Sequence, residues 1–156
     1  MFQHMFDPIQ IGNLTLPNRF VRSATFDSGA DVYGKVTDQQ VQLFAELAKN
    51  HIGLIISGIA SVHPSGRISP FQLDISHDGC IPGLRKIADA VHDQKSKAAV
   101  QLFHAGREGE KYQKHHGSQA MAPSYVPDDP YCACIGREMS EEEIREAIEA
   151  FGAAAE

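Results

Sequence analysis

The chain has 156 residues, a formal net charge of −6 and 42% hydrophobic residues, which is an ordinary composition for a folded domain. A net negative chain without a cluster of Lys and Arg lacks the basic surface that nucleic acid or anionic lipid requires, and no apolar run approaches the ~20 residues that span a bilayer. The residues from Met1 to Pro8 have neither a basic start nor a continuous apolar core. We therefore expect no secretory signal and a cytoplasmic location, with neither nucleic acid nor membrane as a partner.

The three cysteines, Cys80, Cys132 and Cys134, are too few for a disulfide scaffold, and we interpret them as reduced thiols. The histidines at 115–116 and the last two cysteines could together form a zinc site. Their Cys-x-Cys spacing differs from the usual Cys-x2–4-Cys of such sites, so we expect no metal.

The amino-terminal part of the chain predicts a hairpin followed by a strand. Short alternating runs at 9–11 and 14–16 flank Gly12-Asn13, a dipeptide typical of a two-residue hairpin turn. The run 19–25 begins as a strand and becomes polar at its end, where residues of a parallel sheet often face a ligand.

Two strand–helix units follow in the middle of the chain. Thr37 and Gln40 have the spacing of a capping box, so a helix is predicted to start there, with Phe44 on its apolar face. The nearly all-apolar run 53–58 predicts a strand that is buried on both faces of a parallel sheet. A second helix is expected after Pro82, again with one apolar face.

A third unit begins with a strand at 97–104. The stretch 105–139 is rich in Gly, Pro, Ser and Tyr and is predicted to be a long irregular loop that serves as an active-site or interface segment. Ser140 and Glu143 then form a second capping box, and the apolar positions from Ile144 to Phe151 predict the core-facing stripe of a third helix.

A hairpin followed by three strand–helix units favours an α/β fold with a parallel sheet. A closed (β/α)8 TIM barrel needs ~250 residues. If the units belong to such a barrel, residues 1–156 are the opening part of a single barrel domain.

The residues that could carry chemistry stand at the ends of the three predicted strands, because the common nucleotide, metalloprotease and hydrolase motifs are all absent. The three sets are Asn18-Arg19-Phe20-Val21-Arg22-Ser23-Ala24-Thr25, then Ser57-Gly58-Ile59-Ala60 with Gly66-Arg67-Ile68, and Gln101-Leu102-Phe103-His104-Ala105-Gly106-Arg107. In this order, behind a short hairpin, they resemble the old yellow enzyme family of flavin-dependent ene-reductases. The likeness is greater to the branch with the dienoyl-CoA and 2-enoate reductases, and it covers the whole chain.

The resemblance implies a (β/α)8 barrel with FMN at the carboxyl ends of its strands and the hairpin at its bottom. It assigns cofactor contacts to Ser23, Ala24, Thr25, Phe26, Gly58, Ile59 and Gln101. Thr25 would donate a hydrogen bond near flavin O4 and N5, and Gln101 would contact the pyrimidine edge. His104 and Arg107 would support the top of the third strand. Another branch has Cys where Phe26 stands, so no thiol is expected beside this flavin.

The implied reaction has two halves. NADH or NADPH gives a hydride to FMN, and reduced FMN gives it to the β-carbon of an alkene that a carbonyl polarises. In the family, the residues that hold this carbonyl lie on the next strand unit, so the catalytic residues are expected beyond residue 156. The expected partners are a small electrophilic substrate and either a second copy of the chain or the carboxyl-terminal part of a barrel.

Other interpretations stay open from the sequence. Thr25 and Gln101, each taken alone, are more simply an ordinary strand-end hydroxyl and a buried amide that satisfies backbone groups. His104 is equally well a hydrogen-bonded core histidine, and Arg107 a partner in a structural ion pair. The whole chain could be a non-catalytic truncated barrel that acts only in assembly, or a different α/β enzyme that binds a phosphorylated ligand.

Overall fold

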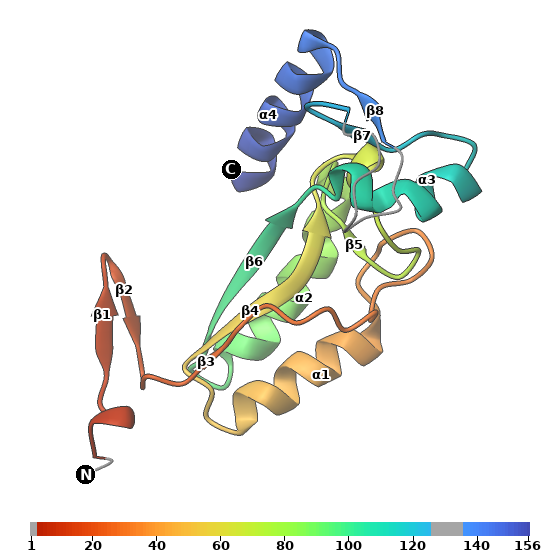
Figure 1. The fold of residues 1–156 in the computed structure, drawn as a ribbon. Helices are drawn as coiled ribbons and strands as arrows, with labels where there is room; N and C mark the ends of the chain where they lie inside the picture. Colours follow the sequence, from red (N-terminus) through yellow and green to blue (C-terminus); the bar gives the residue numbers. More distant parts are fainter. Residues whose placement is uncertain (1–2, 126–135) are drawn as a thin grey trace.

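The computed structural model describes residues 3–125 and 136–156, which form a hairpin followed by parallel strands and helices (Figure 1). Strands β1 (Ile9–Ile11) and β2 (Leu14–Leu16) pair antiparallel, which confirms the predicted hairpin. Gly12 occupies the first central position of the turn with a φ of +56°, a conformation that glycine adopts without steric cost.

The main sheet is parallel, as predicted, and β4 is its central strand. Its members are β3 (Val21–Arg22), β4 (Leu54–Ser61), β5 (Leu73–Asp74) and β6 (Lys97–Phe103). β3 and β5 pair with successive parts of one edge of β4, and β6 pairs along the other edge. Among the described residues, no strand pairs with the outer edge of β6.

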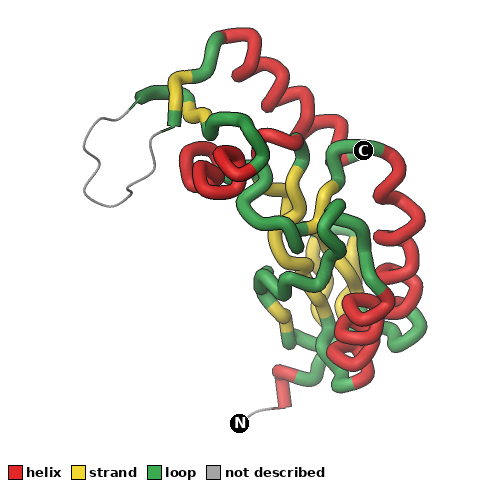
Figure 2. Tube along the Cα trace, turned by 90° about the vertical axis from the view of Figure 1, so that its right-hand side faces the viewer, coloured by secondary structure: helices red, strands yellow, loops and turns green. Residues whose placement is uncertain are grey.

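The helices follow the strands in the order expected of strand–helix units. They are α1 (Asp38–Lys49), α2 (Ile81–His92), α3 (Glu110–His115) and α4 (Glu141–Ala155), with short 3-10 turns at Gln3–Met5, Pro64–Gly66, Asp78–Cys80 and Gly106–Gly109. α1 and α2 lie side by side along one side of the strands (Figure 2). Within the described part of the chain, no helix is long and apolar enough to cross a bilayer.

The two predicted helix starts differ in their capping. At α4 the capping box is complete, because Ser140 Oγ accepts from the Glu143 N–H at 3.2 Å and Glu143 Oε2 accepts from the Ser140 N–H at 2.9 Å. At α1 only the first half forms: Thr37 Oγ1 accepts from the Gln40 N–H at 3.2 Å. The Gln40 amide donates to Asp27 Oδ1 at 3.1 Å, so it ties the loop before α1 to the helix.

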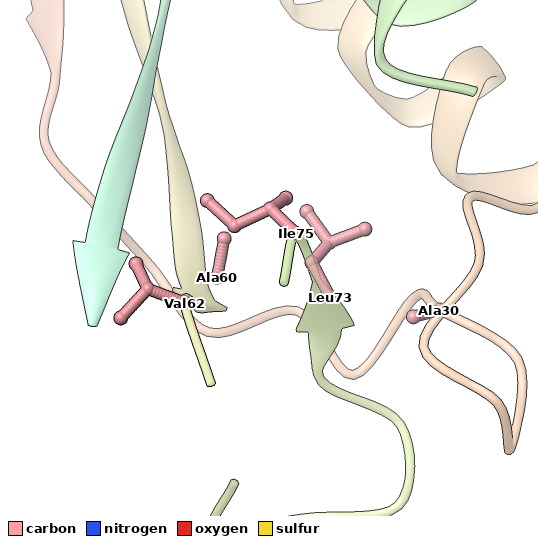
Figure 3. Packing of buried hydrophobic residues seen from close by; sticks show 5 residues of the cluster. All are labelled: Ala30, Ala60, Val62, Leu73 and Ile75. Carbon is pink, nitrogen blue, oxygen red and sulfur yellow. The ribbon is translucent and has the colours of Figure 1, made fainter. Parts of the chain in front are cut away.

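Two buried clusters connect the sheet to its helices. The first joins α1 and α2 to the first halves of the central strands and contains Phe44, Ala48, Ile55, Ile87 and Val91. The second covers the ends of β4 and β5 and contains Ala30, Ala60, Val62, Leu73 and Ile75 (Figure 3). Apolar burial of this kind is the main favourable term in folding, so these clusters hold the strands and helices together.

The structure corrects two predicted strand boundaries. The strand expected over 19–25 is reduced to β3, because only Val21 and Arg22 find partners on β4. The strand expected to end at residue 58 continues to Ser61. Gly58 and Ile59 therefore lie inside β4 and not at its end, since β4 continues past an irregularity in its pairing with β6.

Two further predictions fail in the carboxyl-terminal part. The stretch 105–139 is not wholly irregular: it contains α3 and a parallel pair of short strands, β7 (Met121–Ala122) and β8 (Arg137–Glu138). The predicted core-facing stripe of α4 is wrong, because Ile148 is 65% exposed and no side chain of α4 is buried. The helix instead packs Ala150 and Ala154, which the periodicity did not single out, against the second cluster.

Candidate functional site

Residues from the loop after β3 lie directly against β4. A Cβ atom built on Gly58 would stand 2.7 Å from the Thr25 carbonyl oxygen and 3.1 Å from the Phe26 Cα. Any side chain at position 58 would push the 25–26 segment away from the strand. Because Gly58 has no side chain, the segment with Thr25 and Phe26 can lie against β4. Two of the predicted sets of cofactor contacts are thereby brought together.

Gln101, from the third predicted set, lies beside Gly58 and Ile59 because β6 pairs with β4. Ile59 is in register with Gln101, and Ser57 Oγ accepts a hydrogen bond from the Gln101 N–H at 3.2 Å. The structure therefore brings together Thr25, Phe26, Gly58, Ile59 and Gln101, which sequence reasoning placed at three separate strand ends.

The polar side chains of this group are exposed, so a ligand can reach them. Thr25 is exposed, and its hydroxyl donates to the Ser23 carbonyl at 3.1 Å. Gln101 is also exposed, and within the described residues its side-chain amide has no hydrogen-bond partner. Ser23 is exposed and Ala24 partly buried along the same segment. A hydroxyl and an amide of this kind can donate to and accept from a flat heterocycle that carries N–H and C=O groups on its edge.

The segment that carries Thr25 and Phe26 is held from behind by α1. Thr37 Oγ1 donates to the Gly29 carbonyl at 2.6 Å, and Gln40, only 2% exposed, donates to Asp27. Asp27 Oδ1 also accepts from the Gly29 N–H at 2.8 Å. These contacts fix the loop to the start of α1 before any ligand binds, which is the preorganisation a binding site needs.

His104 lies at the carboxyl end of β6 and is linked to the loop after β4. The Gly106 N–H donates to His104 Nδ1 at 3.0 Å, so the neutral ring carries its hydrogen on Nε2, which lies 3.0 Å from Ser65 Oγ. Ser65 Oγ in turn lies 2.7 Å from His63 Nδ1, which also accepts from the Ser65 N–H. Partial burial, and then the nearby His63, lower the pKa of His104, so the ring is held neutral.

Arg107 follows within the 3-10 turn Gly106–Gly109, and a Cβ atom on Gly136 would lie 3.0 Å from its Cβ. Both residues expected to support the third strand are thus placed just after β6. His104 joins β6 to the β4 loop through hydrogen bonds, whereas Arg107 packs against the segment that leads into β8.

Two large grooves lie elsewhere, on the helical side of the sheet. One, of about 490 Å³, runs between α2 and β6 past Leu84, Ala88 and Val100, and the other, of about 900 Å³, separates the end of α4 from the start of α2. Neither is lined by Thr25, Ile59 or Gln101. These two grooves are therefore separate from the predicted site.

Two of the four ligands of the zinc alternative, Cys132 and Cys134, lie outside the described residues. In the described part, no group of three or more His, Cys, Asp or Glu side chains could hold a metal ion. His116 Nδ1 lies 2.8 Å from the Tyr112 carbonyl and its ring stacks on Tyr112, so it closes the end of α3. Cys80 is a free thiol whose pKa is raised, mainly by burial.

Sequence reasoning missed several residues that shape the site. Ser57 makes a hydrogen bond that joins β4 to β6. Ser65 links His63, after β4, to His104, after β6. Gln40 holds the loop before α1. The only signal for Ser57 was a polar residue within an apolar strand. The role of Gln40 was hidden by the capping-box pattern, which assigns its side chain to another partner.

Comparison with known proteins places this geometry in a family. The profile described as the NADH:flavin oxidoreductase / NADH oxidase family matches residues 4–156. Among solved structures, 2-naphthoyl-CoA reductase in complex with 2-naphthoyl-CoA is 28% identical with a TM-score of 0.89, and the match covers 99% of this chain and 25% of that one. The old yellow enzyme from Pichia sp. AKU4542 is 25% identical with a TM-score of 0.87, over 97% of this chain and 42% of that one.

Morphinone reductase in complex with tetrahydroNAD is likewise 25% identical with a TM-score of 0.83, over 97% of this chain and 45% of that one. The chain thus spans less than half the length of these structures. FMN and a nicotinamide, the two cofactors expected from the sequence, are confirmed for the family. With its whole length from residue 4 onward matched, this chain belongs to the NADH:flavin oxidoreductase / NADH oxidase family.

Proposed function

We propose that this chain is the opening part, with three strand–helix units, of a (β/α)8 barrel in an FMN-dependent oxidoreductase that reduces activated alkenes or related electrophiles with NADH or NADPH. The proposal rests on one observation: Thr25 and Phe26 meet Gly58, Ile59 and Gln101 at the irregularity in the pairing of β4 with β6. Residues of β4, of β6 and of the loop after β3 reach one place there, as a barrel site requires.

The residues present fit the ring system of a flavin. Gln101 offers an exposed side-chain amide with both a donor and an acceptor, which suits the N–H and C=O groups of the pyrimidine edge. The backbone of Ser23 to Phe26 would lie along the ring, and the Thr25 hydroxyl would turn from the Ser23 carbonyl to donate near O4 and N5. When bound, the flavin supplies the hydride transfer, and the protein supplies its orientation and its electrostatic surroundings.

The protein's own groups act on the ring by hydrogen bonding. A donor at Thr25 favours the ring with more negative charge, so it raises the reduction potential of a bound flavin. His104 and Arg107 would keep the end of β6 in place, His104 through its link to Ser65. Polarisation of the carbonyl acceptor would fall to residues outside these 156, as in the branch of the family that the sequence resembles.

The first test is flavin retention by the chain itself. The purified chain would be mixed with FMN, desalted and measured by visible absorption, with its native mass determined in parallel. We expect flavin to be retained and its affinity to fall in Gln101→Ala and Thr25→Ala, with a lower reduction potential in Thr25→Ala. Unchanged affinity and potential in both variants would refute the assigned contacts.

A second candidate function is a non-catalytic piece that acts in assembly, and one observation favours it. The outer edge of β6 is unpaired in the described residues, and Ala99 and Val100 on it are exposed. Unpaired edges of parallel sheets associate readily with other strands. Failure to retain FMN, together with a concentration-dependent increase in native mass, would favour this candidate over the first.

A further inference from the structure

The bulge in β4 is an irregularity that the proposed function does not by itself explain. Ile56 pairs with Ala99 and Ile59 with Gln101, so Ser57 and Gly58 together stand opposite the single residue Val100. Two residues facing one is the pattern of a β-bulge, a feature that re-aims side chains and is frequent beside active sites.

The bulge decides which residues face the predicted flavin. Ile55 packs in the first cluster and Ala60 in the second, so both point to the helices, although five positions of regular alternation would put them on opposite faces. On β6, Ala98 and Leu102 pack against these same clusters with no such change. The extra residue in β4 therefore leaves Ile59 on the face opposite the helices, in register with Gln101.

Ser57 repairs the hydrogen bonding that the bulge interrupts. Its side chain is 3% exposed, and its hydroxyl donates to the Gly58 carbonyl at 2.7 Å while accepting from the Gln101 N–H at 3.2 Å. A buried N–H without a partner is costly, so this hydroxyl takes the place of a missing ladder carbonyl. Ser57 thus contacts the backbone of Gln101 from the side of the strand away from the proposed ligand.

We propose that Ser57 is a positioning residue for flavin binding: its hydroxyl fixes the backbone of Gln101 at the bulge, and thereby the point from which the Gln101 amide reaches the ring. This inference rests on the proposed function, because it needs Gln101 in the flavin site. Ser57 touches no ligand itself and acts only through Gln101.

The matched variants are Ser57→Thr and Ser57→Val, which have nearly the same shape and differ in a hydroxyl against a methyl group. The groove between α2 and β6, which Ser57 lines, offers room for the added atoms. In fluorescence titrations of the 156-residue chain with FMN, we expect Ser57→Val to weaken binding about threefold to tenfold, the range that one net hydrogen bond supplies. Ser57→Thr should keep the wild-type affinity.

A double-mutant cycle separates positioning from a general structural effect. In a Gln101→Ala background, Ser57→Val should weaken FMN binding no further, because the amide that it positions is gone. An equal loss in both backgrounds, or no loss in Ser57→Val while Gln101→Ala weakens binding, would overturn the inference. Gln101→Ala without any effect would instead contradict the proposed site.

Amide hydrogen exchange of the flavin-free chain keeps the inference testable if no FMN binds at all. The Gln101 N–H should exchange faster in Ser57→Val than in Ser57→Thr, with the exchange of the Ala98 N–H as the internal reference. Equal exchange at Gln101 in both variants would show that the hydroxyl does not hold this backbone. Thermal unfolding of both variants identifies any general loss of folding that affects them equally.

Discussion

The helices that pack on β4 and β6 contrast sharply in how far their apolar faces are buried. Along α1 and α2, Phe44 is 1% exposed and Val91 is completely buried, so both helices are joined to the sheet by a continuous apolar cluster. At α4, Ile148 is 65% exposed and Phe151 36% exposed, although the stripe has the same periodicity. The comparison teaches that an amphipathic pattern specifies a helix and a face, whereas burial of that face depends on a neighbouring element.

The largest expected effect tests this contrast directly. Phe44→Ala should cost about 3–5 kcal/mol of the free energy of unfolding, because it empties a fully buried site. Ile148→Ala should change it by less than about 0.5 kcal/mol, because that side chain is mostly in water. Urea denaturation of both variants gives the two values. Similar losses would mean that the stripe of α4 is covered in solution, for example by a second copy.

Two glycine substitutions sharpen the comparison, because they should change the free energy of unfolding in opposite directions. Gly58→Ala should destabilise the chain by about 1–3 kcal/mol and weaken FMN binding, because its Cβ would meet the Thr25 carbonyl. Gly152→Ala in α4 should stabilise the chain by about 1 kcal/mol, since no atom lies within 4 Å of the added Cβ and Ala is the better helix former. Chemical denaturation measures both, and a stabilising Gly58→Ala would show that the 25–26 segment does not press on β4.

The two helix caps should differ by a smaller amount. Ser140→Ala should cost about 1 kcal/mol, the usual value for an N-cap hydroxyl. Thr37→Ala should cost more, up to about 2 kcal/mol, because Thr37 caps α1 and also donates to the Gly29 carbonyl. The matched controls are Ser140→Thr and Thr37→Ser, which keep the hydroxyls. A greater loss in Ser140→Ala than in Thr37→Ala would contradict the view that α1 anchors the site.

The smallest effect concerns pH and the end of β6. His104 has a lowered pKa in the folded chain, so between that value and the ordinary 6.5 the unfolded chain binds more protons. The stabilisation is therefore complete above pH 6.5 and is lost as the pH falls towards the folded pKa. Thermal unfolding between pH 7.5 and 5 should show a weaker pH dependence in His104→Gln than in the wild-type chain. His4→Gln, at an exposed position, is the control and should behave as the wild type.

Much of the fold could be predicted because local signals and burial agreed. Gly12-Asn13 predicted the hairpin, Thr37 and Ser140 marked the helix starts, and the apolar run from Gly53 predicted a central strand. α3 was missed because a helix of this length has too few positions for a periodic pattern. The role of Gln40 was misassigned because its amide found Asp27, a residue in another segment.

The sequence by itself determined the order of the elements, the residues with chemical potential and the resemblance to flavin-dependent reductases, because each depends on neighbours along the chain. Only the tertiary structure decided that β4 bulges at Ser57 and Gly58, so that Ile59 and Gln101 share a face, and that the Ser57 hydroxyl serves the Gln101 N–H. It also decided that Ile148 and Phe151, on the predicted stripe of α4, stay exposed. These outcomes depend on contacts between distant segments, and no pattern within one segment specifies them.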